Sequence, residues 1–182
     1  MSPSDGARIV ELAKSDAHLG ELRSRYSSSD YYDVSVRRES QGWRIELVLR
    51  PFGKSLNKEY KGRLFEDHVE EARVFVALLD DRQVGWIELG YERWNNRMRV
   101  WEFLVEEGFR RRGIGTLLMK HAVKVAKERG ARMLVLETQS CIGPAMDFYL
   151  EFGFDLIGFD TGAYSNEDIQ RKEVRLELGL KL

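Results

Sequence analysis

Two glycines stand between a predicted strand and a predicted helix near the middle of the chain. The strand covers residues 100–105, and helical periodicity runs over residues 117–129. A glycine loop between such elements presents backbone N–H groups at the positive end of the helix dipole, and neighbouring arginines add positive charge. The sequence therefore predicts an anion site whose best ligand is a diphosphate. Its residues are Arg110, Arg111, Arg112, Gly113, Ile114, Gly115 and Thr116.

The spacing of these glycines excludes two common phosphate-binding motifs. The dinucleotide fingerprint needs a third glycine where this chain has Leu118, and the loop lacks the Gly-Lys-Ser/Thr ending of a P-loop. A helix start that needs tight packing is the alternative interpretation of the two glycines.

The pattern around the loop predicts a mixed sheet with helices on its faces. Three strands with short connections precede the loop and form an antiparallel meander. The helix after the loop is expected to end at Gly130, because glycine is common at the residue that follows a helix. We expect an α/β (α+β) fold with a mixed, mostly antiparallel twisted sheet. The expected strands are residues 74–79, 84–89, 97–105, 133–136, a segment after 154 and 173–178, with a second helix at 144–152.

The first third of the chain carries a weaker pattern. Residues 1–29 have loosely helical spacing, and alternation at residues 32–36 and 45–49 on either side of a Ser-Gln-Gly turn predicts a hairpin. Residues 51–63 are rich in Gly, Lys and Asn and are expected to form a loop. We expect one domain over residues 1–182, in which 1–60 form an N-terminal extension and 70–182 the core.

Composition and charge limit the classes of partner that this chain is expected to bind. The formal net charge of −1 gives no general attraction to nucleic acid, and no run approaches the length of a membrane span. The N-terminus lacks the pattern of a secretory signal, so a cytoplasmic location is expected. The single cysteine, Cys141, excludes an internal disulfide and is expected to be a buried thiol, and three scattered histidines predict no metal site.

A second motif lies downstream of the loop. Residues 145–154 fit the pattern A-x-x-F-Y-x-x-x-G-F. With the Arg-x-x-Gly-x-Gly loop before it, the chain resembles the GNAT superfamily of acetyl-CoA-dependent N-acetyltransferases over roughly residues 70–182. This resemblance implies acetyl-CoA as cofactor, with its pyrophosphate on the loop at 110–116. It also implies that the pantetheine arm lies along a splayed strand at Phe103, Leu104 and Val105.

A narrower resemblance concerns the acceptor side. The segments beginning at Trp94, Leu136, Phe148 and Tyr164 are similar to stretches of streptothricin acetyltransferases, which acetylate an amine of an antibiotic. The resemblance implies that the substrate is bound by Trp94, Glu137, Gln139 and Tyr164.

Three residues are candidates for proton transfer. Aminolysis requires removal of a proton from an amine, which costs about 4 kcal/mol at pH 7. Glu102 on the strand beside the loop is the candidate base, with an ordinary half-buried surface carboxylate as the alternative. Glu137 is a second candidate, for which a structural ion pair is the alternative. By the resemblance, Tyr149 lies near the CoA sulfur and protonates the leaving thiolate, unless it is only a core aromatic.

These inferences favour direct transfer of an acetyl group from acetyl-CoA to a primary amine, on a streptothricin-like or other small molecule. A protein N-terminus or lysine as acceptor, and a non-catalytic acyl-CoA sensor with the same fold, stay open as alternatives. A small-molecule amine is the expected partner, with no nucleic acid and no membrane, and the chain is expected to be a monomer or a homodimer.

Overall fold

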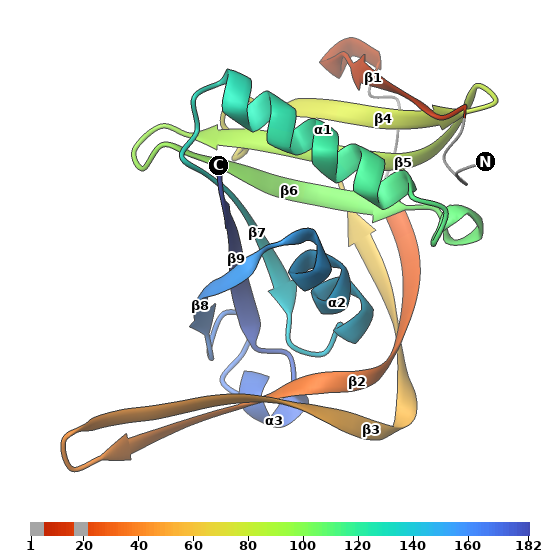
Figure 1. Ribbon diagram of the computed structural model, residues 1–182. Coiled ribbons are helices and arrows are strands. Elements are labelled where there is room, and N and C mark those ends of the chain that lie inside the picture. Colours follow the sequence, from red (N-terminus) through yellow and green to blue (C-terminus); the bar gives the residue numbers. More distant parts are fainter. Residues whose placement is uncertain (1–5, 17–21) are drawn as a thin grey trace. The chain divides into compact units, whose positions relative to one another are not determined.

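The computed structural model describes residues 6–16 and 22–182 (Figure 1). The chain divides into two compact units. The first comprises Met1–Arg25, Glu59–Leu136 and Leu180–Leu182, and the second Tyr26–Lys58 and Glu137–Gly179. None of the described helices is long and apolar enough to cross a membrane.

The first unit is built on a sheet with the strand order β1-β4-β5-β6-β7. Neighbouring strands from β1 to β6 are antiparallel, and β6 pairs with β7 in parallel. These pairings confirm the predicted meander and the predicted mixed sheet. The bounds are β1 Arg8–Leu12, β4 Arg73–Leu79, β5 Arg82–Glu92, β6 Arg97–Val105 and β7 Met133–Gln139, with short 3-10 turns at Lys14–Asp16 and Glu107–Phe109.

Helix α1 (Ile114–Glu128) packs against β4, β5 and β6 (Figure 1). Its buried side chains recur at helical spacing, as the sequence predicts. Gly85 in β5 allows the close approach, because a Cβ at this position would lie 3.0 Å from Leu118 Cδ1 and 3.2 Å from Ile114 Cγ2. The helix N-terminus is thereby held at the end of the sheet where β6 stops. The buried residues of α1 are Ile114, Leu118, Met119, Ala122, Val125 and Ala126.

The helix expected over residues 1–29 is wrong wherever that range is described. Residues Arg8–Leu12 form the edge strand β1, paired with β4, and β2 begins at Leu22. Only the 3-10 turn Lys14–Asp16 is helical in any sense, and the remainder of the expected helix, at 1–5 and 17–21, lies outside the described residues. Pairing with β4 gives Arg8–Leu12 backbone hydrogen bonds that a weak local helical pattern cannot match.

The second unit contains most of a long two-stranded ribbon together with α2, α3, β8 and β9. The ribbon consists of β2 (Leu22–Glu39) and β3 (Gly42–Gly62), which confirms the predicted hairpin but makes it much longer. In this unit β9 lies between β7 and β8 and is antiparallel to β8. The other bounds are α2 Gly143–Phe152, β8 Asp155–Asp160, α3 Asp168–Arg171 and β9 Arg175–Lys181.

The base of the ribbon is tied to the segment before α2. Ser28 Oγ accepts a hydrogen bond from Gly143 N–H at 3.0 Å, and Tyr32 N–H donates to the Ser140 carbonyl at 2.8 Å. The loop expected at residues 51–63 is wrong, because β3 continues to Gly62. Every side chain of residues 51–62 is exposed or half-buried, so this part of β3 lacks the alternation that reveals a half-buried strand.

Candidate active site

The predicted anion loop occupies the turn between β6 and α1. After β6 the chain makes the short 3-10 turn and then adopts left-handed backbone conformations at Arg111 (φ 61°) and Gly113 (φ 79°). A left-handed arginine costs roughly 1–2 kcal/mol, which the surrounding structure must offset. Gly113 adopts the same region without that cost. Alternation of this kind turns successive backbone N–H groups toward one side and creates an anion-binding concavity.

The first turn of α1 leaves donors for such an anion. No side chain caps the helix, and the first intrahelical bond runs from Leu117 N–H to the Gly113 carbonyl at 2.9 Å. The N–H groups of Ile114, Gly115 and Thr116 come before this bond and therefore have no acceptor within the helix. Two of the three predicted arginines lie exposed beside these donors. The backbone N–H donors, the dipole of α1 and the positive charge of the arginines together suit a diphosphate.

Arg110 has a different role from its two neighbours. Its Nε donates to the Val105 carbonyl at 3.1 Å, and its Nη2 donates to Ser24 Oγ at 2.6 Å. The side chain thus ties the end of β6 to the beginning of β2. Arg112 lies with its guanidinium 5.3 Å from the centre of the Phe109 ring, and Arg111 makes no ion pair with any described residue.

The strand before the loop separates from its parallel neighbour. Pairing between β6 and β7 covers Arg97–Val100 against Met133–Leu136, and none is described beyond it. Glu106 N–H donates to the Val84 carbonyl of β5 at 3.0 Å. Because backbone groups alternate along a strand, those of Phe103 and Val105 face the opposite side, where pairing with β7 has ended. Leu104, between them, is buried. The predicted splayed strand is therefore present.

A bulge in β6 sets the direction of Glu102. The register of β5 with β6 shifts between Glu88 and Leu89, which leaves Trp101 as the extra residue. Past the bulge, Glu102 lies directly opposite Glu88. Tyr60 Oη lies 2.7 and 2.6 Å from the two carboxylate oxygens of Glu102 and donates its proton to this carboxylate.

Both carboxyl groups of this pair have raised pKa values. Burial is the main cause of the rise in the pKa of Glu102 to about 7, and the neighbouring carboxylates of Glu88 and Glu66 add to it, whereas the Tyr60 hydrogen bond opposes it. Glu88 is only 1% exposed, and burial raises its pKa as well, opposed by a 2.6 Å hydrogen bond from Phe65 N–H. Sequence reasoning missed Tyr60 and Glu88, since neither carries a motif.

Trp94 lies in the turn between β5 and β6 and is 82% exposed. The guanidinium of Arg97 stands 5.8 Å from the centre of its ring. An exposed indole of this size is available for contact with a ligand.

The second unit brings together the other three residues predicted to bind substrate. Tyr164 Oη donates to Glu137 Oε1 at 2.5 Å, and Gln139 also forms a hydrogen bond with the Tyr164 side chain. Arg175, which sequence reasoning missed, pairs with Glu137 Oε2 at 3.0 Å. Gln139 Oε1 further accepts from Lys58 Nζ at 3.5 Å, and Lys58 forms an ion pair with Glu173. Glu137 is thus both an ion-pair partner and an exposed carboxylate.

Tyr149 lies on the buried side of α2. Its ring makes edge contacts with Phe148 at 5.6 Å and with Phe154 at 5.9 Å between ring centres. Burial raises the pKa of its hydroxyl, so the group is held in its protonated form. A protonated hydroxyl is the state required of a proton donor. Cys141 is a fully buried free thiol, as predicted, and burial raises its pKa.

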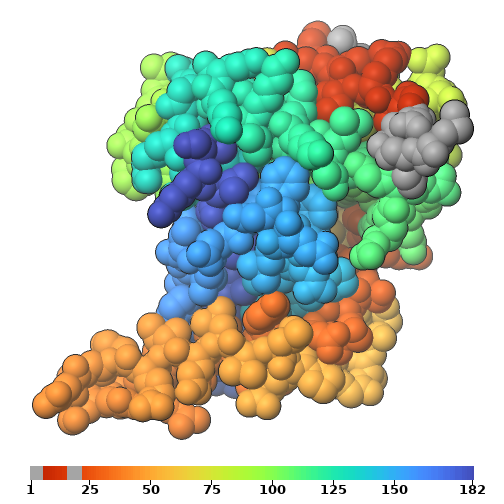
Figure 2. Space-filling model, in the orientation of Figure 1, coloured from red at the N-terminus to blue at the C-terminus, as the bar shows by residue number. Residues whose placement is uncertain are grey.

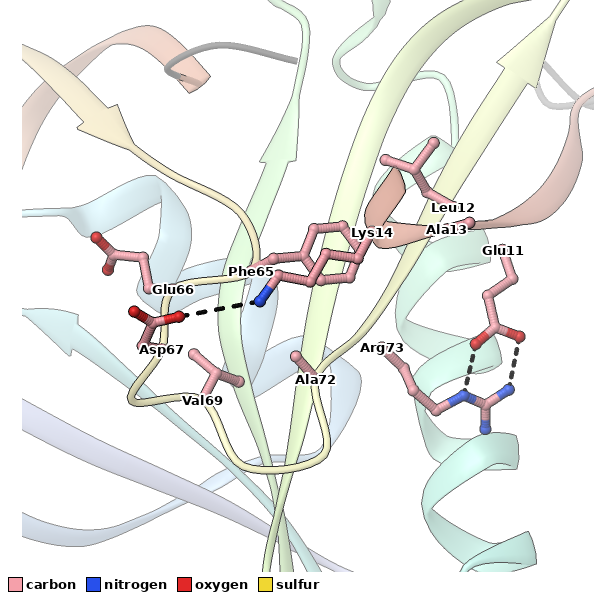
Figure 3. A pocket seen from close by; sticks show the side chains of 10 residues that line it. All are labelled: Glu11, Leu12, Ala13, Lys14, Phe65, Glu66, Asp67, Val69, Ala72 and Arg73. Atoms are coloured by element: carbon pink, nitrogen blue, oxygen red, sulfur yellow. Dashed lines mark hydrogen bonds and ion pairs between the residues drawn. The ribbon is translucent and has the colours of Figure 1, made fainter. Parts of the chain in front are cut away.

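A separate cavity of about 420 Å³ lies in the first unit beside β1 (Figure 3). Its lining carries the ion pair of Arg73 with Glu11 at 2.7 Å and the looser approach of Lys14 to Asp67 at 3.9 Å. None of the residues predicted for the site is among its described lining residues. No group of three or more His, Cys, Asp or Glu side chains among the described residues could hold a metal ion.

Comparison with known protein families gives a match to the model described as the acetyltransferase (GNAT) family, over residues 43–154. A streptothricin acetyltransferase from Streptomyces lavendulae is 38% identical to this chain over 148 residues, which cover 79% of this chain and 78% of that protein.

Solved structures of the same fold match nearly the whole chain. A nourseothricin acetyltransferase superposes with a TM-score of 0.76 at 28% identity, covering 97% of this chain and 98% of its own. A putative streptothricin acetyltransferase from Bacillus anthracis, solved in complex with acetyl coenzyme A, gives the same TM-score at 24% identity and covers 97% of both chains. The latter similarity concerns the fold, which is thereby confirmed for this chain.

Proposed function

Because the chain belongs to the acetyltransferase (GNAT) family, we propose that it transfers an acetyl group from acetyl-CoA to a primary amine of a streptothricin-like antibiotic. The observation that carries this proposal is the loop between β6 and α1. Its left-handed residues, the uncapped first turn of α1 and the exposed Arg111 and Arg112 together suit the pyrophosphate of a nucleotide cofactor.

The residues of the first unit would hold acetyl-CoA in two ways. Backbone N–H groups of Ile114, Gly115 and Thr116 and the two exposed arginines would bind the pyrophosphate. Backbone groups of Phe103 and Val105 would bond the pantetheine arm along the side of β6 that β7 leaves. Bound in this way, acetyl-CoA supplies the acetyl group, and Arg110 acts indirectly by fixing the end of the strand through Val105.

The acceptor is proposed to be cationic because of the charge of the second unit. Residues 137–170 of this unit contain seven acidic side chains and no lysine or arginine. Within this stretch, Glu137 is exposed and is held by Tyr164 and by an ion pair with Arg175, so its carboxylate oxygens lie at a defined position where they can also accept from an ammonium group. The 38% identity to a streptothricin acetyltransferase supports an antibiotic amine as the acceptor. Trp94 and Gln139 are proposed to contact the remainder of this substrate.

Glu102 is the proposed base. Its pKa of about 7 is close to the pH at which the reaction must run, and general-base catalysis is most efficient under that condition. Glu137 is less suited to this role because each of its carboxylate oxygens already has a partner, Arg175 on one and the Tyr164 hydroxyl on the other. Tyr149, protonated and buried, is the proposed donor of a proton to the thiolate of CoA.

A steady-state assay of free CoA with a thiol reagent tests this function. The chain is given acetyl-CoA with streptothricin, aminoglycosides, polyamines or short peptides, and a reaction without amine serves as the control. Amine-dependent release with streptothricin, at a kcat/KM well above that with every other amine, is expected. Release with peptides alone would replace the proposed acceptor by a protein amine. Absence of release with every amine would overturn the proposed function.

A further inference from the structure

The ribbon of the second unit is apolar on one face. In β2, the buried residues Ser28 and Val34 are both even-numbered and therefore lie on the same face of the strand. Ion pairs between Glu39 and Arg44 and between Asp33 and Arg50 mark the opposite face. Since hairpin partners share faces, the odd-numbered residues of β3 lie with Val34.

This apolar face continues beyond the point where its own chain covers it. The far part of the ribbon, residues 35–50, projects past the helices and strands of the second unit (Figures 1 and 2). Trp43 is 66% exposed and Leu49 is 52% exposed, and Ile45 between them is also exposed. We name this set the tip face, formed by Val36, Trp43, Ile45, Leu47 and Leu49. Large apolar side chains in a continuous row on a projecting element are typical of an interaction surface.

A projecting two-stranded ribbon gains little stability from its own pairing. Isolated hairpins are marginally stable in water, and packing against a further layer is needed for a firm structure. The tip face has no such layer within the described part of its own chain, as its exposure demonstrates.

A surface of matching character lies on the same unit. Helix α2 and the edge strand β8 expose the apolar side chains Leu150, Leu156 and Ile157 among acidic ones. We name this the α2–β8 surface, comprising Asp147, Leu150, Glu151, Asp155, Leu156 and Ile157. A register shift in the pairing of β8 with β9 places a bulge at Ile157, which favours packing through side chains over edge-to-edge pairing.

The two surfaces are complementary in charge. By the strand alternation, the tip face carries one basic side chain, Arg38, and no acidic one over residues 36–49, whereas the α2–β8 surface carries three acidic groups and no basic one. Both surfaces are exposed in a single chain, so neither covers the other there. In a two-fold dimer each copy provides both, and the pairing closes on itself.

We propose that the tip face of one copy packs on the α2–β8 surface of a second copy, so that the protein is a homodimer joined by reciprocal ribbons. The α2–β8 surface of a second copy offers apolar and acidic groups together, and these match the apolar row and the basic Arg38 of the tip face. The proposal does not depend on the acceptor of the acetyl group.

Sedimentation or light scattering of the full chain tests the dimer, with Leu49→Glu and its matched control Val48→Glu. Val48 is also exposed, at 43%, but lies on the opposite face of the same strand. The wild type is expected at twice the chain mass of 21.2 kDa. Leu49→Glu and, on the other surface, Leu156→Glu are expected to weaken association at least tenfold, while Val48→Glu remains dimeric.

Circular dichroism of each variant confirms that it is folded before its mass is interpreted. A wild type with the mass of one chain at its highest soluble concentration would overturn the proposal. So would a Leu49→Glu variant that remains fully dimeric, or a Val48→Glu variant that dissociates equally. Dissociation by Leu49→Glu without any effect of Leu156→Glu would overturn the assignment of the α2–β8 surface as the partner of the tip face.

Discussion

Glu88 and Glu102 lie directly opposite each other on the antiparallel strands β5 and β6, just past a bulge at Trp101. Like charges at such positions destabilise a sheet, and the nearly complete burial of Glu88 increases the cost of charging both. The pair is therefore expected to hold a proton near neutral pH. This relationship places a carboxyl with a pKa of about 7 on β6, the strand that leads to the anion loop.

Replacing Glu102 with glutamine should remove the base. We expect kcat/KM to fall at least about 100-fold, since general-base catalysis contributes roughly 10²–10⁴ in rate. The wild-type profile of kcat/KM should rise with pH through about 7, as Glu102 loses its proton, and the variant should lack this rise. Glu106→Gln is the matched control, because the Glu106 side chain forms an ion pair with Arg82 at the surface. An unchanged profile in Glu102→Gln would contradict the assignment.

Glu102→Gln, which should lower kcat/KM, should raise the stability of the folded chain at high pH. The pKa of Glu102 in the folded chain lies above its ordinary value of 4.5, so its charged form weakens folding as pH rises from about 4.5 through 7. Glu102→Gln should therefore be more stable than the wild type above pH 7 and not below pH 4.5. Thermal denaturation at pH 5 and pH 8 measures this difference.

Tyr60→Phe should shift the pH profile without abolishing activity. The Tyr60 hydroxyl lowers the pKa of Glu102 by donating to its carboxylate, so its removal should raise that pKa and move the profile to higher pH. Glu88→Gln should move the profile to lower pH, since it removes a neighbouring carboxylate. Shifts of both variants in the same direction would refute the proposed electrostatic pair.

Arg111→Ala and Arg112→Ala should each raise the KM for acetyl-CoA about 3- to 10-fold, the effect of losing an exposed charge-assisted contact of about 1 kcal/mol. The KM for the amine should not change. Lys124→Ala provides the control, because Lys124 lies on α1 ten residues after its start, where it forms an ion pair with Glu128. A KM for acetyl-CoA equal to that of the wild type in the double variant would be inconsistent with phosphate binding at this loop.

Tyr149→Phe should lower kcat about 10- to 100-fold while acetyl-CoA binds as before. Phenylalanine keeps the ring contacts with Phe148 and Phe154, so the fold should be retained. Calorimetric titration with acetyl-CoA separates binding from turnover. Wild-type kcat in this variant would remove the hydroxyl from the proposed proton transfer.

The sequence predicts the part of the fold in which local pattern and burial agree. From β4 to β8 each expected strand and helix is present, since most carry a clear period and end at a glycine or a turn. The loop expected at residues 51–63 is wrong because this part of β3 has no buried side chain on either face and its sequence shows no alternation. The helix expected in the first residues is wrong because Arg8–Leu12, despite their loose helical spacing, pair with β4 as a strand.

The candidate site is predictable only where a motif carries it. The loop at Arg110 to Thr116 follows from glycines and arginines in sequence. The contact of Tyr60 with Glu102 joins residues 42 positions apart and depends on the bulge at Trp101, which no local signal reveals. The turn of Arg110 toward Val105 and Ser24 is equally a consequence of tertiary structure.

Mass spectrometry of streptothricin after incubation with the chain and acetyl-CoA tests the central claim most directly. We predict a gain of one acetyl group on an amine of the antibiotic, formed together with an equal amount of free CoA and strongly reduced in Glu102→Gln. Unmodified streptothricin, while CoA is released with another amine, would contradict the proposed acceptor. Unmodified streptothricin without any release of CoA would contradict the account as a whole.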